Sequence, residues 1–290
     1  GSLPFGKKTR IMLLYRLQDG VLIKGQHQAA LLPGEDWDTF INDDALFTKV
    51  KALLAQYAAA IDLEAILRDQ LLPPIVRQEV WASGVTYYNS KLARQEESKN
   101  AGGGDFYAKV YTAERPELFL KASAHRTVGH TGQVRIRRDS TWNVPEPELT
   151  LLLTSSGKTV AYTIGNDMSS RSIEGENPLY LPQAKTYDGC AALGPGLLVC
   201  DDRLPSETSI SMEIFRDDKQ VFEGSTQLAA MKRDPAELAA FLFRECSFPD
   251  GCFLMTGTGI VPDSHFTLAA GDHIRIEIPP IGVLENVVGE

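Results

Sequence analysis

The stretch PEPELTLLLTSSGKTVAYTIGND, from Pro145 to Asp167, places two glutamates one residue apart at the head of an apolar strand. Successive side chains of a strand point to opposite faces, so Glu146 and Glu148 face the same way. The letters LTLLLT and TVAYTIG indicate two strands, and the return strand closes on an aspartate. The pattern therefore predicts a hairpin with carboxylates gathered at its open end.

The register of this hairpin decides which carboxylates meet. The letters SSGK predict a four-residue loop, a common hairpin connection. With the loop at Ser155–Lys158, Thr154 pairs with Thr159, and counting outward sets Glu146 opposite Asp167. A shift of one residue would send Asp167 to the other face, so the prediction depends on the loop length.

Three carboxylates within a few ångströms repel one another unless a cation lies among them or some are protonated. A set of oxygen ligands suits a hard divalent ion, Mg²⁺ above all, with Mn²⁺ or Ca²⁺ as alternatives. The other interpretation is an ordinary solvated strand end with unconnected charges. The residues of the hairpin by themselves leave both interpretations open.

Composition excludes several classes of protein. The 290 residues are 43% hydrophobic and 23% charged, as in ordinary globular proteins, and the formal net charge of -9 disfavours nucleic acid as a partner. No apolar run approaches the roughly 20 residues of a membrane span, and no signal peptide is recognisable. The four cysteines have no metal-ligand spacing. We therefore expect buried thiols, a cytoplasmic location and no membrane partner.

Patterning divides the chain into two predicted domains, a small N-terminal α/β domain (1–75) and a catalytic domain (76–290). The first begins with the strand-like RIMLLYRL and continues with two helical patterns, DALFTKVKALLAQYAAA and DLEAILRDQLL. Pro73 and Pro74 end the second helix and mark the boundary.

The second domain is rich in strand patterns. They are EVWASGVTYYNS, VRIRRD, LTLLLT, TVAYTIG, GLLVC, SISMEIFRD and HIRIEI. The segment KLARQEESKNAGGGDF predicts a helix leading into a mobile loop. Another helix, DPAELAAFLFREC, begins with Asp234 as N-cap and Pro235 at the first helical position. The fold class is α+β.

Beyond the hairpin, the segment YTIGNDMSSRSIEGENPLYLPQAKTYDGCAALGPGLLV (162–199) resembles the fumarylacetoacetate hydrolase family. PELFLKAS (116–123) and LMTGTGIVPD (254–263) resemble two further motifs of that family, in the same order. The resemblance covers about residue 78 to the end. It implies a β-sandwich roll after the N-terminal domain, and a homodimer or a tetramer built from dimers.

The resemblance also implies a metal held by Glu146, Glu148 and Asp167, with Lys185 pointing into the site and Arg171 nearby. A divalent cation that chelates a 2-oxo acid stabilises the enolate formed on loss of a C3 proton. We expect the pKa of Lys185 to be depressed beside such a cation, so that its amine can act as a base or hydrogen-bond the enolate.

One departure from the family bears on the reaction. Hydrolytic members use a histidine in the helix after the first core strand, whereas this chain reads GVTYYNSKLARQEES there, with Ser90 about where the histidine is expected. Serine cannot replace imidazole as a general base near pH 7. Together with GENPLYLPQAKTYDG, this segment resembles the sugar-acid dehydratase branch, which converts 2-keto-3-deoxy-pentonate to 2,5-dioxopentanoate.

That reaction requires an acid to protonate the departing C4 hydroxyl. The candidates are Glu96 or Glu97, carried by a closing segment, and Glu117 beside the core strand. The glycines Gly102–Gly104 provide the hinge of that segment, whose closure would exclude water. Three further side chains, Arg171, Ser90 and Thr258, are expected to contact the substrate.

Two other functions stay open at this point. One is a metal-enolate enzyme of another kind, an acylpyruvate-type C–C hydrolase or an oxaloacetate decarboxylase. It requires a water-activating base, for which His125 and His130 are the candidates. The other is a non-catalytic binding protein that has kept the fold, against which the intact set of ligands and lysine argues.

Overall fold

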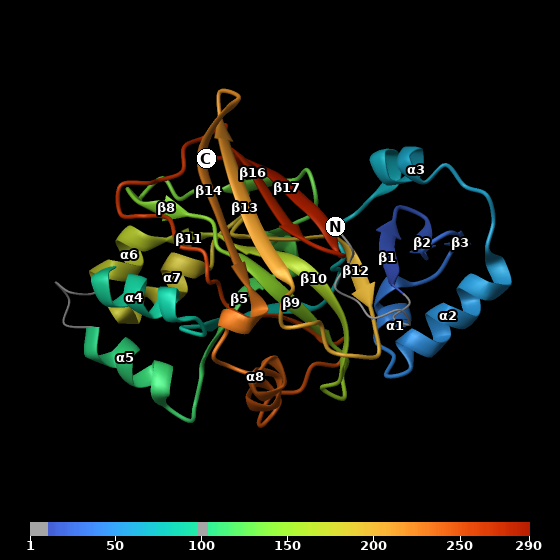
Figure 1. Ribbon diagram of the computed structural model, residues 1–290, viewed down its shortest axis with the longest axis horizontal. Coiled ribbons are helices and arrows are strands. Elements are labelled where there is room, and N and C mark those ends of the chain that lie inside the picture. Colours follow the sequence, from blue (N-terminus) through green and yellow to red (C-terminus); the bar gives the residue numbers. More distant parts are fainter. Residues whose placement is uncertain (1–10, 98–103) are drawn as a thin grey trace.

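The computed structural model describes residues 11–97 and 104–290, whose strands build two packed sheets (Figure 1). In the larger sheet the order of strands is β3 (Ala29–Pro33), β2 (Gly20–Lys24), β1 (Met12–Leu17), β12 (Ala191–Val199), β10 (Thr159–Asp167), β9 (Pro147–Leu153), β15 (Cys252–Met255), β4 (Glu79–Gly84) and β5 (Glu117–Ser123), with β6 (Thr127–Val128) paired to β12. In the smaller sheet it is β14 (Lys219–Gln227), β13 (Ser209–Arg216), β16 (His273–Ile278), β17 (Gly282–Gly289) and β7 (Gln133–Arg135). A short pair, β8 (Asn143–Val144) and β11 (Ser169–Ser170), lies apart.

Two groups of helices lie at opposite ends of the molecule (Figure 1). Beside the first three strands lie α1 (Trp37–Ile41), α2 (Leu46–Tyr57) and α3 (Leu63–Gln70). At the other end lie α4 (Tyr88–Glu97), α5 (Gly104–Thr112), α6 (Arg171–Glu176) and α7 (Leu181–Lys185). The helix α8 (Pro235–Leu242) begins as predicted, since the Asp234 side chain accepts a hydrogen bond from the Ala236 backbone N–H.

The two faces of β9 are buried against different partners. Leu149, Leu151 and Leu153 belong to the core between the two sheets. Leu152, on the alternate face, belongs to a second core that includes residues of α1 and α2, such as Phe40. Since both faces of the strand are covered, any charged group near its head lies in a largely dehydrated environment.

The predicted hairpin is present, and Glu146 is opposite Asp167 as expected, because the Asp167 N–H donates to the Glu146 carbonyl at 2.9 Å. The predicted pairing beside the loop was wrong: Thr159 pairs with Leu153 instead of Thr154. An extra residue, Val160, then forms a β-bulge that shifts the register by one. The bulge restores the alignment that the simple count assumed.

The α+β fold class is confirmed, and so are the first strand and the two helices after it. The hairpin of β2 and β3 between them was not anticipated. Its strands join the larger sheet because β1 pairs antiparallel with β12, so the N-terminal segment extends the sheet of the second region. The division at residue 75 stays a prediction. Among the described residues, no helix has the length and apolar character needed to cross a bilayer.

Candidate metal centre and active site

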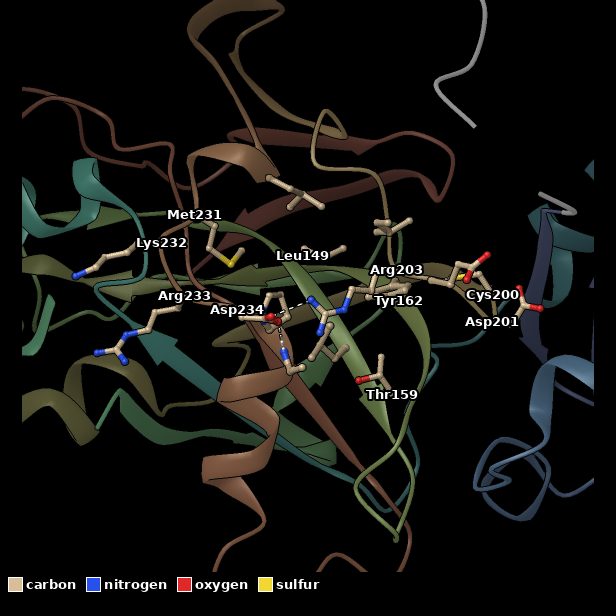
Figure 2. Close-up of a pocket in the computed structure, with 16 residues that line it drawn as sticks. Leu149, Thr159, Tyr162, Cys200, Asp201, Arg203, Met231, Lys232, Arg233 and Asp234 are labelled. Carbon is tan, nitrogen blue, oxygen red and sulfur yellow. Dashed lines mark hydrogen bonds and ion pairs between the residues drawn. The ribbon is translucent and has the colours of Figure 1, made fainter. Parts of the chain in front are cut away.

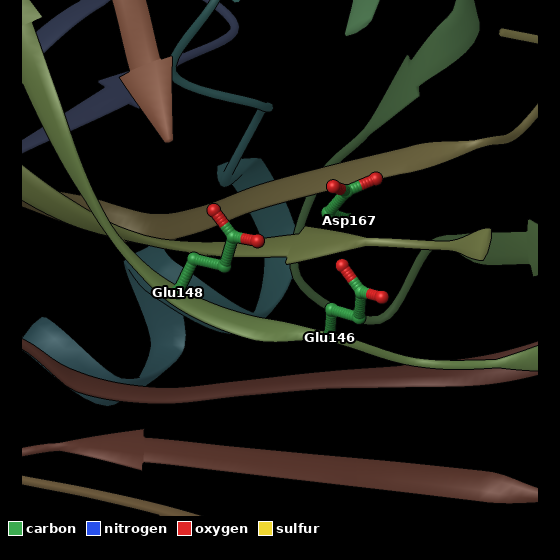
Figure 3. Close-up of side chains that lie close together, drawn as sticks. All are labelled: Glu146, Glu148 and Asp167. Atoms are coloured by element: carbon green, nitrogen blue, oxygen red, sulfur yellow. The ribbon is translucent and has the colours of Figure 1, made fainter. Parts of the chain in front are cut away.

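Three carboxylates converge at the open end of the hairpin (Figure 3). Glu146 immediately precedes β9, Glu148 lies in it, and Asp167 ends β10. Each offers a ligand oxygen, and these oxygens all lie within 4.8 Å of one another. The three residues are between 1% and 6% exposed. The interpretation as a solvated strand end is therefore wrong, because water cannot screen these charges.

The electrostatics of the group fit a cation. Burial raises the pKa of Glu148 well above its ordinary value, and the negative charges of Asp167 and Glu146 raise it further. Burial also opposes ionisation of Asp167, but Lys121 and Lys185 outweigh it and hold the pKa of Asp167 below its ordinary value. A buried carboxylate set with this much repulsion is a suitable donor set for a hard divalent ion such as Mg²⁺.

Two buried lysines contact the carboxylates. Lys185 Nζ lies 2.8 Å from Glu146 Oε2 and 2.9 Å from Asp167 Oδ2, and it also donates to Ser169 Oγ at 2.6 Å. Lys121, from β5, lies 2.9 Å from Asp167 Oδ1 and donates to the backbone carbonyls of Met168 and Lys185. Asp167 is thus held from both sides by ammonium groups.

The expected depression of the Lys185 pKa does not come from the protein groups around it. Burial lowers the pKa of Lys185, but the nearby Asp167 and Glu146 carboxylates outweigh this, and the pKa is raised. A depressed pKa would therefore require a cation that takes up the charge of the same carboxylates.

The loop that contains TGT orients one of the three carboxylates. The Gly257 N–H donates to Glu148 Oε2 at 2.7 Å. Gly257 has φ of +95°, and a Cβ there would lie 2.0 Å from Thr86 Oγ1, so this close approach requires glycine. Thr258, next in the loop, is buried and lines the same cavity as the carboxylates.

The structure brings the other expected contact residues to this cavity. Arg171, at the start of α6, places Nη2 at 3.4 Å from Glu146 Oε1. Ser90 also lines the cavity, and its hydroxyl donates to the Tyr87 carbonyl at 2.7 Å. Both line the cavity that holds the carboxylates, and their roles stay predictions.

The candidates for the acid are distributed differently. Glu117, at the start of β5, lies against Gly84 of the cavity wall, where an added Cβ would come within 1.9 Å of Glu117 Oε2. Burial raises the pKa of Glu117. Glu96 is exposed on α4 and lines a neighbouring cavity with Arg171. The side chain of Glu97 and most of the predicted hinge, residues 102 and 103, lie outside the described structure.

A larger cavity of about 520 Å³ lies against the face of β9 opposite to the one that carries Glu148 (Figure 2). Leu149 and Leu151 line it, whereas Glu148, the residue before Leu149, lines the carboxylate cavity with Glu146 and Asp167. At its rim Arg203 pairs with Asp234 at 2.8 Å. The three clustered carboxylates and Lys185 line the smaller cavity instead.

Comparison with known proteins agrees with this site. The family described as "Fumarylacetoacetate (FAA) hydrolase C-terminal" matches residues 84–289. The chain belongs to the fumarylacetoacetate hydrolase family. The "Probable 2-keto-3-deoxyxylonate dehydratase" of Haloferax volcanii is 44% identical over 241 residues, 83% of this chain and 82% of the relative. The "2-dehydro-3-deoxy-D-arabinonate dehydratase" of Saccharolobus solfataricus is 39% identical over 246 residues, 82% of this chain and 83% of the relative.

A solved structure shows that the similarity covers nearly the whole of this chain. It is "2-keto-3-deoxy-D-arabinonate dehydratase complexed with magnesium and 2,5-dioxopentanoate", with a TM-score of 0.81 and 35% identity. The match covers 96% of this chain and 98% of that one. The β-sandwich roll expected from the resemblance is thereby confirmed.

No histidine lies among the described residues that line the carboxylate cavity. His125 Nδ1 lies 3.0 Å from Ser123 Oγ, and His130 Nδ1 accepts a hydrogen bond from the Glu285 backbone. Burial lowers the pKa of His130. Neither histidine is positioned to activate water in this cavity.

Sequence reasoning missed three residues of this family member's site. Lys121 stands in the motif PELFLKAS, whose lysine was a usable signal. Arg94 of α4 and Glu174 of α6 lie 80 residues apart in the chain, yet Arg94 Nη2 is 2.6 Å from Glu174 Oε1. No sequence pattern pointed to that pair.

Proposed function

We propose that this protein is a Mg²⁺-dependent hydro-lyase that removes water from a 2-keto-3-deoxy-pentonate to give 2,5-dioxopentanoate. The observation that carries the proposal is the buried cluster of Glu146, Glu148 and Asp167 beside Lys185. The two dehydratase relatives and the magnesium complex of a solved dehydratase support it.

In this proposal Glu146, Glu148 and Asp167 hold the ion. The ion supplies positive charge for the carboxylate and keto oxygens of the substrate and stabilises the negative charge that develops on loss of the C3 proton. Lys185, within 2.9 Å of two of the three ligands, lies close enough to assist that proton transfer.

The remaining roles follow from position around the cavity. Glu117 is the favoured acid for the departing C4 hydroxyl, because its carboxyl is buried against Gly84 and its pKa is raised. Arg171, Thr258 and Ser90, which line the cavity, are assigned to substrate binding, with Thr258 on the substrate carboxylate. Glu97 stays a candidate from sequence.

Location and assembly are also proposed. All four cysteines are free thiols, which suits a reducing cytoplasm. The family resemblance implies a homodimer or a tetramer built from dimers, which sedimentation of the purified protein would distinguish.

The test is a turnover assay with Mg²⁺ and each stereoisomer of 2-keto-3-deoxy-pentonate. Any 2,5-dioxopentanoate is coupled to a semialdehyde dehydrogenase and followed as NAD(P)H. We expect one isomer to react in the wild type and none in Glu146→Ala, whereas Glu245→Ala, at an exposed position, should keep wild-type activity.

Silence with every isomer, in protein that binds Mg²⁺, would contradict the dehydratase assignment. Acylpyruvates and oxaloacetate are the comparison substrates. Turnover of either at a rate that rivals the keto-sugar acid would replace the assignment with a C–C hydrolase or a decarboxylase.

A further inference from the structure

A guanidinium lies between two acidic side chains beside the active site. Arg94 Nη2 is 2.6 Å from Glu174 Oε1, whereas Arg94 Nη1 is 3.6 Å from Glu117 Oε1. The three side chains come from α4, α6 and the start of β5. The short contact is a close ion pair, and the longer one exceeds hydrogen-bonding distance.

This trio is withdrawn from water. The side chains of Arg94, Glu174 and Glu117 are 8%, 1% and 17% exposed. The ring of Tyr107, from α5, covers the guanidinium, with 5.3 Å from the guanidinium carbon to the ring centroid. Charges interact strongly in such surroundings. Whether the Arg94 guanidinium lies closer to Glu174 or to Glu117 therefore has a large effect on the charge state of both carboxyls.

The charged and titratable groups that face the Glu117 carboxyl come from four helices and from the residue before β9. They are Arg94 of α4, Tyr107 of α5, Glu174 of α6, Lys185 of α7 and Glu146 ahead of β9. Burial raises the pKa of Glu117, Arg94 and Lys185 act to lower it, and Glu174 and Glu146 act to raise it. The balance is a raised pKa, so the cation nearest to Glu117 does not outweigh burial.

We propose that Glu174 is a positioning residue of this site: it binds the Arg94 guanidinium, keeps it from closing on Glu117, and so leaves Glu117 the proton that the dehydration consumes. The inference rests on the proposed function. In the step itself, the C4–O bond breaks and its electron pair takes the Glu117 proton, so water leaves and a Glu117 carboxylate remains. The C3 proton goes to the base, and the electrons of the C3–H bond form a C3=C4 double bond. Tautomerisation of this 5-hydroxy enone, in which C5 and its hydroxyl each lose a proton and C3 and C4 each gain one, gives 2,5-dioxopentanoate with no change in composition.

The test replaces the carboxylate of Glu174 by an amide and measures the pH dependence of kcat/KM. In Glu174→Gln, the ion pair between Arg94 and residue 174 is lost, and Arg94 can move toward Glu117. The alkaline limb, where the acid loses its proton, should move to lower pH by about one unit, the smaller end of the shift that an adjacent Arg produces. Glu174→Asp, which keeps a carboxylate, should restore the limb toward its wild-type position.

A second readout does not depend on turnover. In Mg²⁺-saturated protein, the infrared band of the protonated carboxyl that disappears in Glu117→Gln identifies the Glu117 proton. This band should titrate at lower pH in Glu174→Gln than in wild type, and near the wild-type pH in Glu174→Asp.

The outcomes separate the two proposals. A lower kcat at every pH with an unmoved alkaline limb and an unmoved infrared titration would overturn the role of Glu174 as a positioning residue and leave only a structural one. Absence of dehydration in the wild type, together with the expected infrared shift, would overturn the proposed function and keep the control of the Glu117 proton by Glu174.

Discussion

Lys121 Nζ lies 2.9 Å from Asp167 Oδ1, and both side chains are at most 2% exposed. The ammonium also donates to the backbone carbonyls of Met168, which follows Asp167, and of Lys185, which ends α7. Lys121 therefore joins β5, the end of β10 and the end of α7 at one point. This arrangement fixes Asp167 in place before any ligand arrives.

Lys121→Met keeps the volume of the side chain but removes its charge. Because a buried carboxylate then loses one of its two cations, we expect the free energy of unfolding to fall by about 3 to 5 kcal/mol. Urea unfolding of the chelator-treated protein measures it. The control is Lys51→Met at an exposed position of α2, which should change little. A loss below about 1 kcal/mol for Lys121→Met would contradict the structural role.

Glu148→Gln should change stability and metal binding in opposite directions. The amide oxygen can still accept the Gly257 N–H, while the variant removes a carboxyl whose ionisation is opposed by burial and by the charges of Asp167 and Glu146. The protein in chelator should therefore unfold at higher urea concentration than wild type.

The affinity of the same variant for Mg²⁺ should fall by at least about 10- to 100-fold. This is the loss that typically follows removal of a residue that only supports a metal ligand, and Glu148 is itself a proposed ligand. Isothermal titration calorimetry measures this. Unchanged Mg²⁺ affinity would show that Glu148 is not a ligand.

Gly84→Ala tests the position of the Glu117 carboxyl. The added Cβ would lie 1.9 Å from Glu117 Oε2, so the carboxyl must move away from the cavity wall. A displacement of about 1 Å at a reacting group costs on the order of a hundredfold, so we expect kcat to fall by about that factor with Mg²⁺ affinity unchanged.

The double variant Gly84→Ala/Glu117→Gln provides the control. If the alanine acts through Glu117, adding it to Glu117→Gln should cause little further loss of kcat. Two independent, multiplying losses would place the effect of residue 84 elsewhere.

The raised pKa of Glu117 also predicts a pH dependence of stability. The folded protein holds this proton above the ordinary value of 4.5, where the unfolded chain has released it. The contribution is fully present below 4.5 and is lost as pH rises through the folded-state pKa. The free energy of unfolding of wild type relative to Glu117→Gln should therefore decrease as pH rises from 4.5, by at most about 1.4 kcal/mol per pH unit. Urea unfolding at a series of pH values measures it, and a rising difference would show that the pKa of Glu117 is lowered instead.

Arg203→Ala separates the two cavities. Arg203 pairs with Asp234 at the rim of the larger cavity, and neither residue belongs to the carboxylate cluster. We expect unchanged turnover and unchanged Mg²⁺ affinity, measured in the same assays as for Glu146→Ala. A loss of turnover with the fold intact would indicate that substrate or product uses the larger cavity.

The sequence by itself determined the hairpin, the face shared by Glu146 and Glu148, and the family motifs around Lys185 and Thr258. These features depend on alternation along one strand or on short spacings, which local chemistry controls. The alignment of Glu146 with Asp167 was also predictable. The Val160 bulge that produces it was not, because a bulge depends on how both faces of the strand pack.

Only the tertiary structure decided which side chains meet across long stretches of chain. Lys121 reaches Asp167 because β5 and the end of β10 converge, and Arg94 reaches Glu174 because α4 lies against α6. Such contacts involve no periodicity that a sequence could reveal. They exist because charged groups withdrawn from water must find partners, and the fold determines which partners are within reach.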